Sequence, residues 1–271
     1  MEFEDILYEK RGGIATITID RPKVLNAFRA ETVEEMLAAM RDAEGDPAIG
    51  VVVLAGAGER AFCAGGDNSA RASGAEKEGG YGGRGLVGLP IEELHSAIRD
   101  SRKPVIAKVQ GYAIGGGNVL ATVCDLTIAS DKAVFGQVGP RVGSVDPGWG
   151  TAYLSRLVGE KRAREIWFLC RRYTAAEALQ MGLINKVVPA DQLDAEVETW
   201  CQEILALSPT AIAIAKRSFN ADSENIRGIG ALGVEALALY YDTEEAKEGT
   251  TAFLEKRPPN FRSKRAKERS R

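Results

Sequence analysis

The sequence lacks the closely spaced cysteines that build disulfide frameworks and zinc sites. Its four cysteines, Cys63, Cys124, Cys170 and Cys201, stand far apart, and none belongs to a CxxC pair. Both kinds of site need cysteines at short, regular spacings, so this distribution argues against either one. We therefore expect reduced thiols, as in a cytoplasmic protein, and no bound metal.

Long apolar runs and an excess of one charge are also missing. No stretch of about 18 uncharged apolar residues occurs, and the first residues, MEFEDILYEK, are acidic without an apolar signal core. The net charge is −3, from 35 basic and 38 acidic residues, so no overall field attracts nucleic acid or an anionic membrane. We expect a cytoplasmic protein that binds neither, and interpret the basic tail Arg262–Arg271 as a solvated terminus.

Histidine is scarce, and His95 is the single one. Imidazole is the side chain best suited to proton transfer near neutral pH. His95 lies on a helix predicted to start at Pro90, and no serine or cysteine is spaced around it as a nucleophile elbow. It is a candidate acid–base residue, with an ordinary structural role in the helix as the alternative.

Apolar patterning predicts a mixed α/β core followed by a helical C-terminal third. A chain of 271 residues suits one full-sized domain, or one domain with an appended segment. Residues 69–88 are rich in glycine and lack periodicity, which predicts a long loop that serves as a lid or binding loop, with a simply mobile segment as the alternative. Strands are predicted over 13–20, 50–54, 104–113, 124–130, 133–135 and 183–188, and helices over 32–43, 90–100, 151–170, 175–181 and most of 191–255, with another helix opening at 115–117. The order indicates repeated β, β, α units.

Two glycine clusters could hold backbone N–H groups against a ligand. Residues 64–67 (AGGD) follow a predicted strand, and residues 115–117 (GGG) open a predicted helix. Glycine lets a backbone approach closely, and a helix N-terminus presents unpaired N–H groups with partial positive charge. Two such donors aimed at one point would stabilise an enolate or a tetrahedral oxyanion by about 3 kcal/mol each. The alternative is a pair of tight turns packed against helices.

With their surroundings, these clusters resemble the crotonase superfamily, also called the enoyl-CoA hydratase/isomerase family. The matching stretches are RPKVLNAF (21–28), AFCAGGD (61–67), KPVIAKVQGYAIGGG (103–117), CDLTIAS (124–130) and FGQVG (135–139). The resemblance covers nearly the whole chain and implies an α/β spiral of ββα repeats over residues 1–200. It also implies a helical C-terminal region over 201–271 that forms a homotrimer or homohexamer, and the N–H groups of Gly66 and Gly116 as oxyanion donors.

The same resemblance implies an acyl-CoA substrate and no tightly bound cofactor, because coenzyme A is part of the substrate. Trp149 would either wall the acyl pocket or pack in the core. Contacts to the thioester and its coenzyme A are expected from Lys23, Leu25, Arg29, Ala64, Gly65, Asp67, Asn68, Tyr81, Tyr112, Gly115, Gly139, Trp149 and Lys256.

The chain departs from the hydratases where those enzymes place two glutamates to activate water. The matching positions are Val119 and Gly139, neither of which transfers a proton, so simple hydration is not expected. FGQVGPRVGSVDPGWGTAYL resembles instead the dihydroxynaphthoyl-CoA synthases, which close a ring by Dieckmann chemistry. That resemblance implies catalytic roles for Ser144, Asp146 and Tyr241, the last from this chain or a neighbouring subunit.

In synthases that lack the glutamate, a bicarbonate ion acts as base beside the glycine that matches Gly139, so bicarbonate near Gln137 and Gly139 is a possible cofactor.

A second departure lies in the loop after residues 64–67. Ser69 stands where the synthases have lysine, and GRGLVGLPIEELHSAIRD resembles the 2-ketocyclohexanecarboxyl-CoA hydrolases, which open a six-membered β-keto ring to pimeloyl-CoA in anaerobic degradation of alicyclic and aromatic acids. We expect the ring-opening hydrolase, with the ring-closing synthase and a non-catalytic thioester binder as alternatives.

Overall fold

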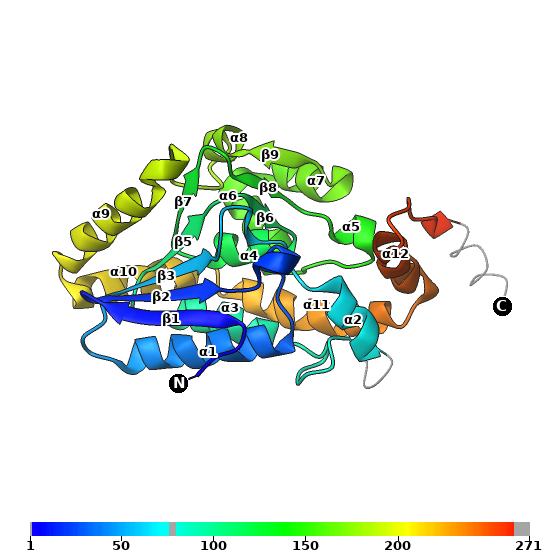
Figure 1. Ribbon diagram of the computed structural model, residues 1–271, viewed down its shortest axis with the longest axis horizontal. Helices are drawn as coiled ribbons and strands as arrows, with labels where there is room; N and C mark the ends of the chain where they lie inside the picture. The colour runs from blue at the N-terminus through cyan, green and yellow to red at the C-terminus, as the bar shows by residue number, and fades with distance from the viewer. Residues whose placement is uncertain (1, 76–79, 263–271) are drawn as a thin grey trace.

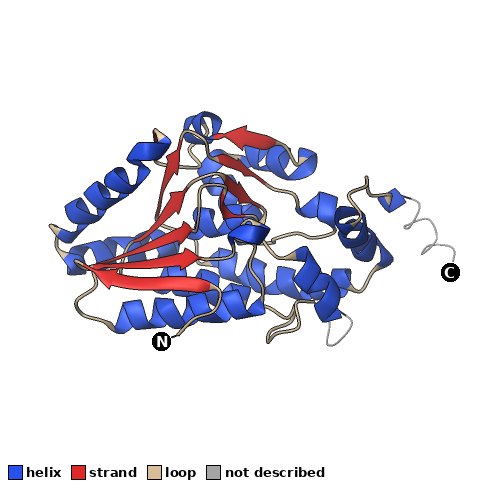
Figure 2. Ribbon diagram, viewed as in Figure 1, coloured by secondary structure: helices blue, strands red, loops and turns tan. Residues whose placement is uncertain are grey.

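The structure is a computed structural model that describes residues 2–75 and 80–262. Residues 76–79 of the predicted binding loop and residues 263–271 of the basic tail lie outside the described residues. Figures 1 and 2 show strands gathered in the middle of the molecule with helices around them. The core therefore forms between sheet and helix layers, as the alternating element pattern predicts.

The larger sheet has six strands in the order β1-β2-β3-β5-β7-β10. Only its β1–β2 pair is antiparallel, and the other neighbours run parallel. Along β3, Val51 and Val53 face a cluster that includes α9, whereas Val52 and Leu54 face the main core, as the two-residue period of a strand requires. The strands are β1 (Ile6–Arg11), β2 (Ile14–Ile19), β3 (Val51–Gly56), β5 (Val105–Val109), β7 (Leu126–Ser130) and β10 (Lys186–Val188).

The smaller sheet has four short strands in the order β4-β6-β8-β9. These are β4 (Ala61–Cys63), β6 (Tyr112–Ile114), β8 (Val134–Gly136) and β9 (Arg172–Thr174). Consecutive strands alternate between the sheets, because β3, β5 and β7 enter the larger sheet and β4, β6 and β8, which follow them, enter the smaller one. This alternation confirms the predicted ββα repeats.

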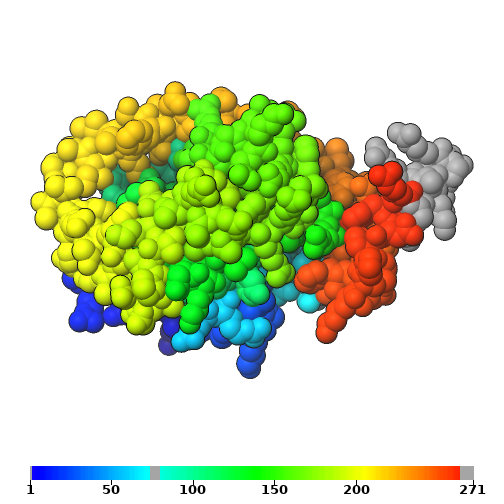
Figure 3. Space-filling model, turned by 90° about the horizontal axis from the view of Figure 1, so that it is seen from above, coloured from blue at the N-terminus to red at the C-terminus, as the bar shows by residue number. Residues whose placement is uncertain are grey.

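Helices cover both sheets and form most of the C-terminal third. Figure 3, seen from above, shows α9 in yellow and the C-terminal segment in orange to red at opposite ends of the molecule. None of the described helices is long and apolar enough to cross a lipid bilayer. The helices and helical turns are η1 (Pro22–Val24), α1 (Ala30–Gly45), α2 (Asn68–Ala75), α3 (Ile91–Asp100), α4 (Gly116–Val123), α5 (Gly139–Val142), η2 (Trp149–Tyr153), α6 (Leu154–Val158), α7 (Glu160–Leu169), α8 (Ala175–Gln180), η3 (Ala190–Gln192), α9 (Leu193–Leu205), α10 (Pro209–Asp222), α11 (Asn225–Tyr241) and α12 (Glu244–Leu254).

The sequence interpretation was wrong at five places. Strands β1 and β9 were not predicted, since β1 is mostly polar and β9 has only three residues. Residues 104–113 form two strands in different sheets, and the predicted helix 151–170 breaks at Gly159. Part of the predicted loop is helix α2, because Asp67 Oδ1 accepts hydrogen bonds from the N–H groups of Ser69 (3.0 Å) and Ala70 (3.3 Å) and so caps it.

Lys216 anchors helix α10 to α3 and to the residues that precede β5 and β7. Its side chain is 7% exposed, and its Nζ donates to the carbonyls of Ile98 (3.0 Å) and Lys103 (2.9 Å) and to Asp125 Oδ2 (2.6 Å). All three protons of the ammonium group thus have acceptors, which offsets the cost of burying the charge.

We expect Lys216→Ala to lower the free energy of unfolding by about 3 kcal/mol, because it leaves the carbonyls of Ile98 and Lys103, as well as Asp125, without their donor. The measurement is the urea midpoint at fixed protein concentration. Lys186→Ala is the control, since Lys186 is 46% exposed in its ion pair with Glu196 and should change stability by under about 1 kcal/mol. Equal losses in the two variants would contradict the anchoring role.

Candidate active site

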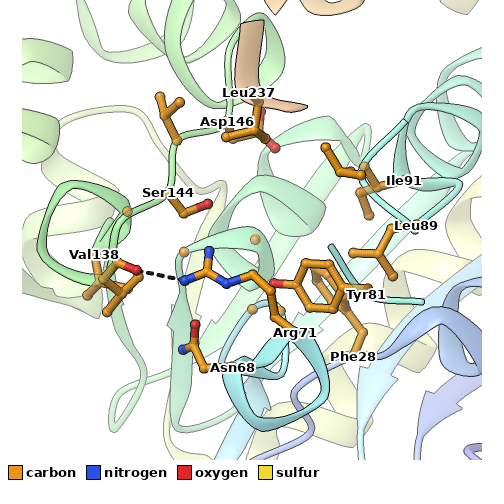
Figure 4. A pocket seen from close by; sticks show the side chains of 18 of the residues that line it. Phe28, Asn68, Arg71, Tyr81, Leu89, Ile91, Val138, Ser144, Asp146 and Leu237 are labelled. Carbon is orange, nitrogen blue, oxygen red and sulfur yellow. Dashed lines mark hydrogen bonds between the residues drawn. The ribbon is translucent and has the colours of Figure 1, made fainter. Parts of the chain in front are cut away.

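A pocket lies where the ends of β4 and β6 meet helices α2, α5 and α11. Figure 4 shows side chains from these separate segments pointing toward one space, with Arg71 and Ser144 on one side and Leu89 and Ile91 on another. Because the carboxyl ends of neighbouring parallel strands lie at the same edge of a sheet, this is where the topology brings loops together.

The two glycine clusters meet in this pocket. Strands β4 and β6 are parallel neighbours, so the turns that follow them lie side by side. Gly65 has φ +91°, and a Cβ there would lie only 2.9 Å from Gly116 N. Only glycine combines this backbone conformation with such a close approach.

Two backbone N–H groups of these turns have no acceptor among the described residues. Phe28 N donates to Gly65 O (2.9 Å), and Asp67 N donates to Phe28 O (2.8 Å), so the N–H of Gly66 points away from Phe28. Gly116 is the first residue of α4, where a helix leaves its N–H groups unpaired. Both glycines line the pocket, as an oxyanion hole requires.

A tyrosine hydroxyl lies against the backbone of Gly66, which carries the first of these donors. A Cβ on Gly66 would collide with Tyr81 Oη, so the two groups are in direct contact. Burial raises the pKa of Tyr81, and the hydroxyl therefore stays neutral at pH 7 and can donate a hydrogen bond.

Asp146 is the carboxylic acid of the pocket. Its Oδ1 accepts a hydrogen bond from Gly150 N at 2.9 Å. Burial raises the pKa of Asp146 to about 7, a rise that the bond from Gly150 opposes and the negative charge of Glu92 assists. A Cβ on Gly150 would lie 3.0 Å from both Asp146 Oδ1 and Val119 Cγ2. The carboxyl group thus sits beside Val119, one of the positions where the hydratases carry glutamate.

Ser144 and Tyr241 form a hydroxyl pair at the other side of the pocket, with their oxygens 2.8 Å apart. Both belong to the same chain, so Tyr241 needs no neighbouring subunit to reach Ser144. The guanidinium of Arg71 lies 4.8 Å from the centre of the Tyr241 ring, within the range of a cation–π contact.

Arg71 is a site residue that sequence reasoning missed. It is buried in α2 and donates to the carbonyls of Val142 (2.7 Å) and Gly143 (3.3 Å) and to Thr250 Oγ1. It therefore ties α2 to the turn before Ser144 and to α12. The available signal was an arginine four residues after Asp67, inside a segment that was interpreted as a loop.

Most of the expected site residues do come together. Asn68, the two glycine turns, and α5 with the turn after it all contribute lining residues. The sequence-predicted residues that line the pocket are Ala64, Gly65, Gly66, Asn68, Tyr81, Gly115, Gly116, Gln137, Gly139, Ser144, Asp146 and Tyr241.

His95 and Trp149 are buried in the core instead, and neither lines this pocket in the described structure. His95 is 1% exposed, its two ring nitrogens have no partner among the described residues, and burial lowers its pKa to about 3. It is therefore neutral at pH 7. Trp149 stacks edge-on against Tyr153 and beneath Arg99.

The other expected contacts to the thioester and its coenzyme A lie outside the pocket lining. Asp67 caps α2 and pairs with Arg21 at 3.2 Å, while Arg29 donates to Asp5 at 2.8 Å. Tyr112 lies beneath Arg172, and Lys256 lines a second groove beside α12. Lys23 and Leu25 lie on and just after the exposed turn η1. Their binding roles stay predictions.

We expect Asp146→Asn to stabilise the protein at pH 8 by about 2 kcal/mol, less than the full shift implies because water reaches part of the pocket. In the folded protein the pKa of Asp146 lies above its ordinary value of 3.8. With respect to this group, the parent protein is therefore most stable below about pH 4, where Asp146 is protonated in both the folded and the unfolded state. It loses this stability as the pH rises through 7 and the folded protein also gives up the proton. Asparagine keeps the oxygen that accepts from Gly150 and removes the charge.

The measurement is the difference in urea midpoint between variant and parent at pH 5 and pH 8, which should be larger at pH 8. Asp242→Asn, at an exposed site after α11, is the control and should give no such trend. The same difference at both pH values would show that Asp146 does not titrate in this range.

Comparison with known proteins identifies the family. Residues 9–264 match the family model described as enoyl-CoA hydratase/isomerase. An enoyl-CoA hydratase from Mycobacterium avium subsp. paratuberculosis is 30% identical, with a TM-score of 0.83, over 96% of this chain and 99% of that chain. A carnitinyl-CoA hydratase from Mycobacterium avium is also 30% identical, with a TM-score of 0.82, over 96% of this chain and 98% of that chain. The chain therefore belongs to the enoyl-CoA hydratase/isomerase family, as its glycine turns and flanking motifs predict.

Proposed function

We propose that this chain is an acyl-CoA hydrolase that opens the ring of a cyclic β-keto thioester, with 2-ketocyclohexanecarboxyl-CoA as substrate and pimeloyl-CoA as product. The observation that carries the proposal is the position of Asp146 in the pocket of the two unpaired N–H groups, at a site where Val119 and Gly139 supply no carboxylate. An acid whose pKa lies near 7 suits proton transfer at neutral pH.

The pocket supplies the parts that ring opening needs. Asp146 accepts a proton from water, and the resulting hydroxide adds to the ring ketone carbon. The bond from that carbon to the α-carbon then breaks, its electron pair forms the thioester enolate, and the ketone carbon becomes the new carboxyl group. The enolate oxygen accepts hydrogen bonds from the N–H groups of Gly66 and Gly116.

Tyr241 completes the reaction by donating a proton to the α-carbon. Its contact with Ser144 (2.8 Å) and the cation of Arg71 over its ring hold the phenol in place. Tyr241 then recovers the proton that Asp146 took from water, which restores both groups, and the product acid ionises. One water is consumed in each turnover.

The walls of the pocket favour an alicyclic ring over a polar acyl group. Phe28, Leu89, Ile91, Trp167 and Leu237 contribute apolar surface. Burying a six-membered ring against such side chains is favourable at roughly 25 cal/mol per Å² of apolar surface removed from water.

A ring-closing synthase is the second candidate, because enolate stabilisation by Gly66 and Gly116 serves bond formation equally well. The bicarbonate base expected for such an enzyme near Gln137 and Gly139 stays a prediction. Gln137 is buried and its Nε2 has no partner in the described chain, which leaves a donor for an anion. A Cβ on Gly139 would lie 2.5 Å from Ser144 O and 2.9 Å from Trp167, so protein atoms fill the side of Gly139 on which a Cβ would lie.

We expect purified protein incubated with 2-ketocyclohexanecarboxyl-CoA in H₂¹⁸O to yield pimeloyl-CoA with the label in the free carboxyl group and not in the thioester. Mass spectrometry of product fragments checks both points. Asp146→Asn should retain thioester binding and lose turnover by about 10²-fold or more, because no base activates the water.

Asp242→Asn again serves as the control and should turn over normally. Absence of ring opening, together with cyclisation of succinylbenzoyl-CoA by the same preparation, would replace the hydrolase by the synthase. Binding of both thioesters without conversion of either would indicate a non-catalytic thioester binder.

We further propose that the chain assembles as a homotrimer, or a homohexamer built from two trimers, through α10 and α11. Large apolar side chains point outward there, with Phe219 77% exposed and Leu232 and Leu239 each 74% exposed. Leu232 and Leu239 lie seven residues apart, on one stripe of α11. Such a surface is a typical protein–protein contact.

Sedimentation equilibrium should give three or six times the 29.1 kDa chain mass. The double change Leu232→Arg and Leu239→Arg should reduce it to one chain mass, because two buried charges would face each other across the contact. Lys186→Ala, away from this surface, should leave the mass unchanged. A monomeric parent protein would contradict the assembly.

A further inference from the structure

Helix α3 presents a polar face to the core. Glu92, His95 and Arg99 are spaced by three and four residues, so they share one side of the helix. His95 and Arg99 are buried, and the guanidinium of Arg99 lies 5.2 Å from the centre of the Trp149 ring. This face therefore packs against η2, which begins three residues after Asp146.

Two glycines bring Glu92 close to the Asp146 turn. A Cβ on Gly230 of α11 would lie 3.1 and 3.4 Å from the two carboxylate oxygens of Glu92. A Cβ on Gly148 would lie 2.7 Å from Gly230 Cα, so these two backbones are in contact. The carboxylate, Gly230 and Gly148 thus stack in that order, and Gly148 is two residues beyond Asp146.

Glu92 has no hydrogen bond or ion pair among the described residues. The nearby Arg227 donates to Ser96 Oγ and Asp100 Oδ1 and pairs with Glu224 instead. Burial raises the pKa of Glu92, and Arg227 lowers it. An acid held without a partner in a partly buried position costs stability, so a structural role does not explain it.

Among the described residues, Glu92 is the acid whose negative charge raises the pKa of Asp146. The remaining ionisable groups around this turn come from α2, α3, α11 and the loop after residue 80. His95 is neutral, and the guanidinium groups of Arg71 and Arg99 are directed to carbonyls, hydroxyls and rings. These groups are Arg71, Tyr81, His95, Arg99, Arg227 and Tyr241.

We propose that Glu92 and Asp146 act as one coupled pair of carboxyl groups, in which Glu92 is a positioning residue whose negative charge lets Asp146 hold the proton taken from water. The geometry that carries this is the stack of Glu92 on Gly230 and Gly148. Two acids in such a pair titrate together, and the charge on one strengthens the hold of the other on its proton. The role in turnover rests on the proposed ring-opening function, whereas the coupling does not.

Infrared titration of the folded protein tests the coupling without substrate. The carboxylic acid C=O band of Asp146 is assigned by its loss in Asp146→Asn. In Glu92→Gln, which keeps the shape and removes the charge, we expect this band to titrate about one pH unit lower than in the parent protein. Glu92→Asp, which keeps the charge, should titrate at a pH between those of Glu92→Gln and the parent protein.

Glu203→Gln removes the same charge from an exposed position on α9 and should leave the band at the parent pH. An unshifted band in folded Glu92→Gln, or an equal shift in Glu203→Gln, would overturn the proposal. The acid limb of the kcat/KM profile gives a second readout. It should move to lower pH by the same amount in Glu92→Gln, which a merely structural role would not cause.

The two proposals fail separately. A shifted infrared titration in a protein that does not open the ring would uphold the coupled pair and reject the hydrolase. Normal ring opening with an unshifted titration would reject the pair alone.

Discussion

The parallel pairing of β4 with β6 is the interaction on which the site depends. It places the turns after both strands at one sheet edge, close enough that a Cβ on Gly65 would lie 2.9 Å from Gly116 N. The N–H of Gly66 points away from Phe28 because its neighbours bond to that residue, and the N–H of Gly116 has no acceptor among the described residues because it begins α4. A donor pair fixed by two backbones needs no reorganisation when charge develops.

Burial sets the chemistry on the opposite side of the pocket. Asp146 receives a hydrogen bond from Gly150 N, yet removal from water dominates and raises its pKa to about 7. The buried Arg71 has a structural role instead. Its guanidinium donates to the carbonyls of Val142 and Gly143 and lies over the ring of Tyr241. Burial therefore raises the pKa of Asp146, while the buried Arg71 holds two segments of the pocket wall together.

Local patterning was reliable for buried elements and unreliable for marginal ones. The continuous apolar run of β3 and the glycine opening of α4 were predicted because burial on both faces and helix initiation leave strong sequence signals. Strand β1 was missed because an edge strand keeps polar residues. Helix α2 was missed because its stability comes from capping by Asp67 and from the distant contacts of Arg71, which no local window contains.

The sequence by itself determined the family, the ββα order, the two glycine turns, the loss of both hydratase glutamates and the candidacy of Asp146 and Tyr241. These are properties of residue type and spacing, which the chain carries before it folds. Only the tertiary structure decided that Ser144 meets Tyr241, that His95 is buried away from the pocket, and that Arg71 and Glu92 flank the site. Each of these depends on contacts between segments distant in the chain, and on how much water those contacts exclude, so no local pattern encodes it.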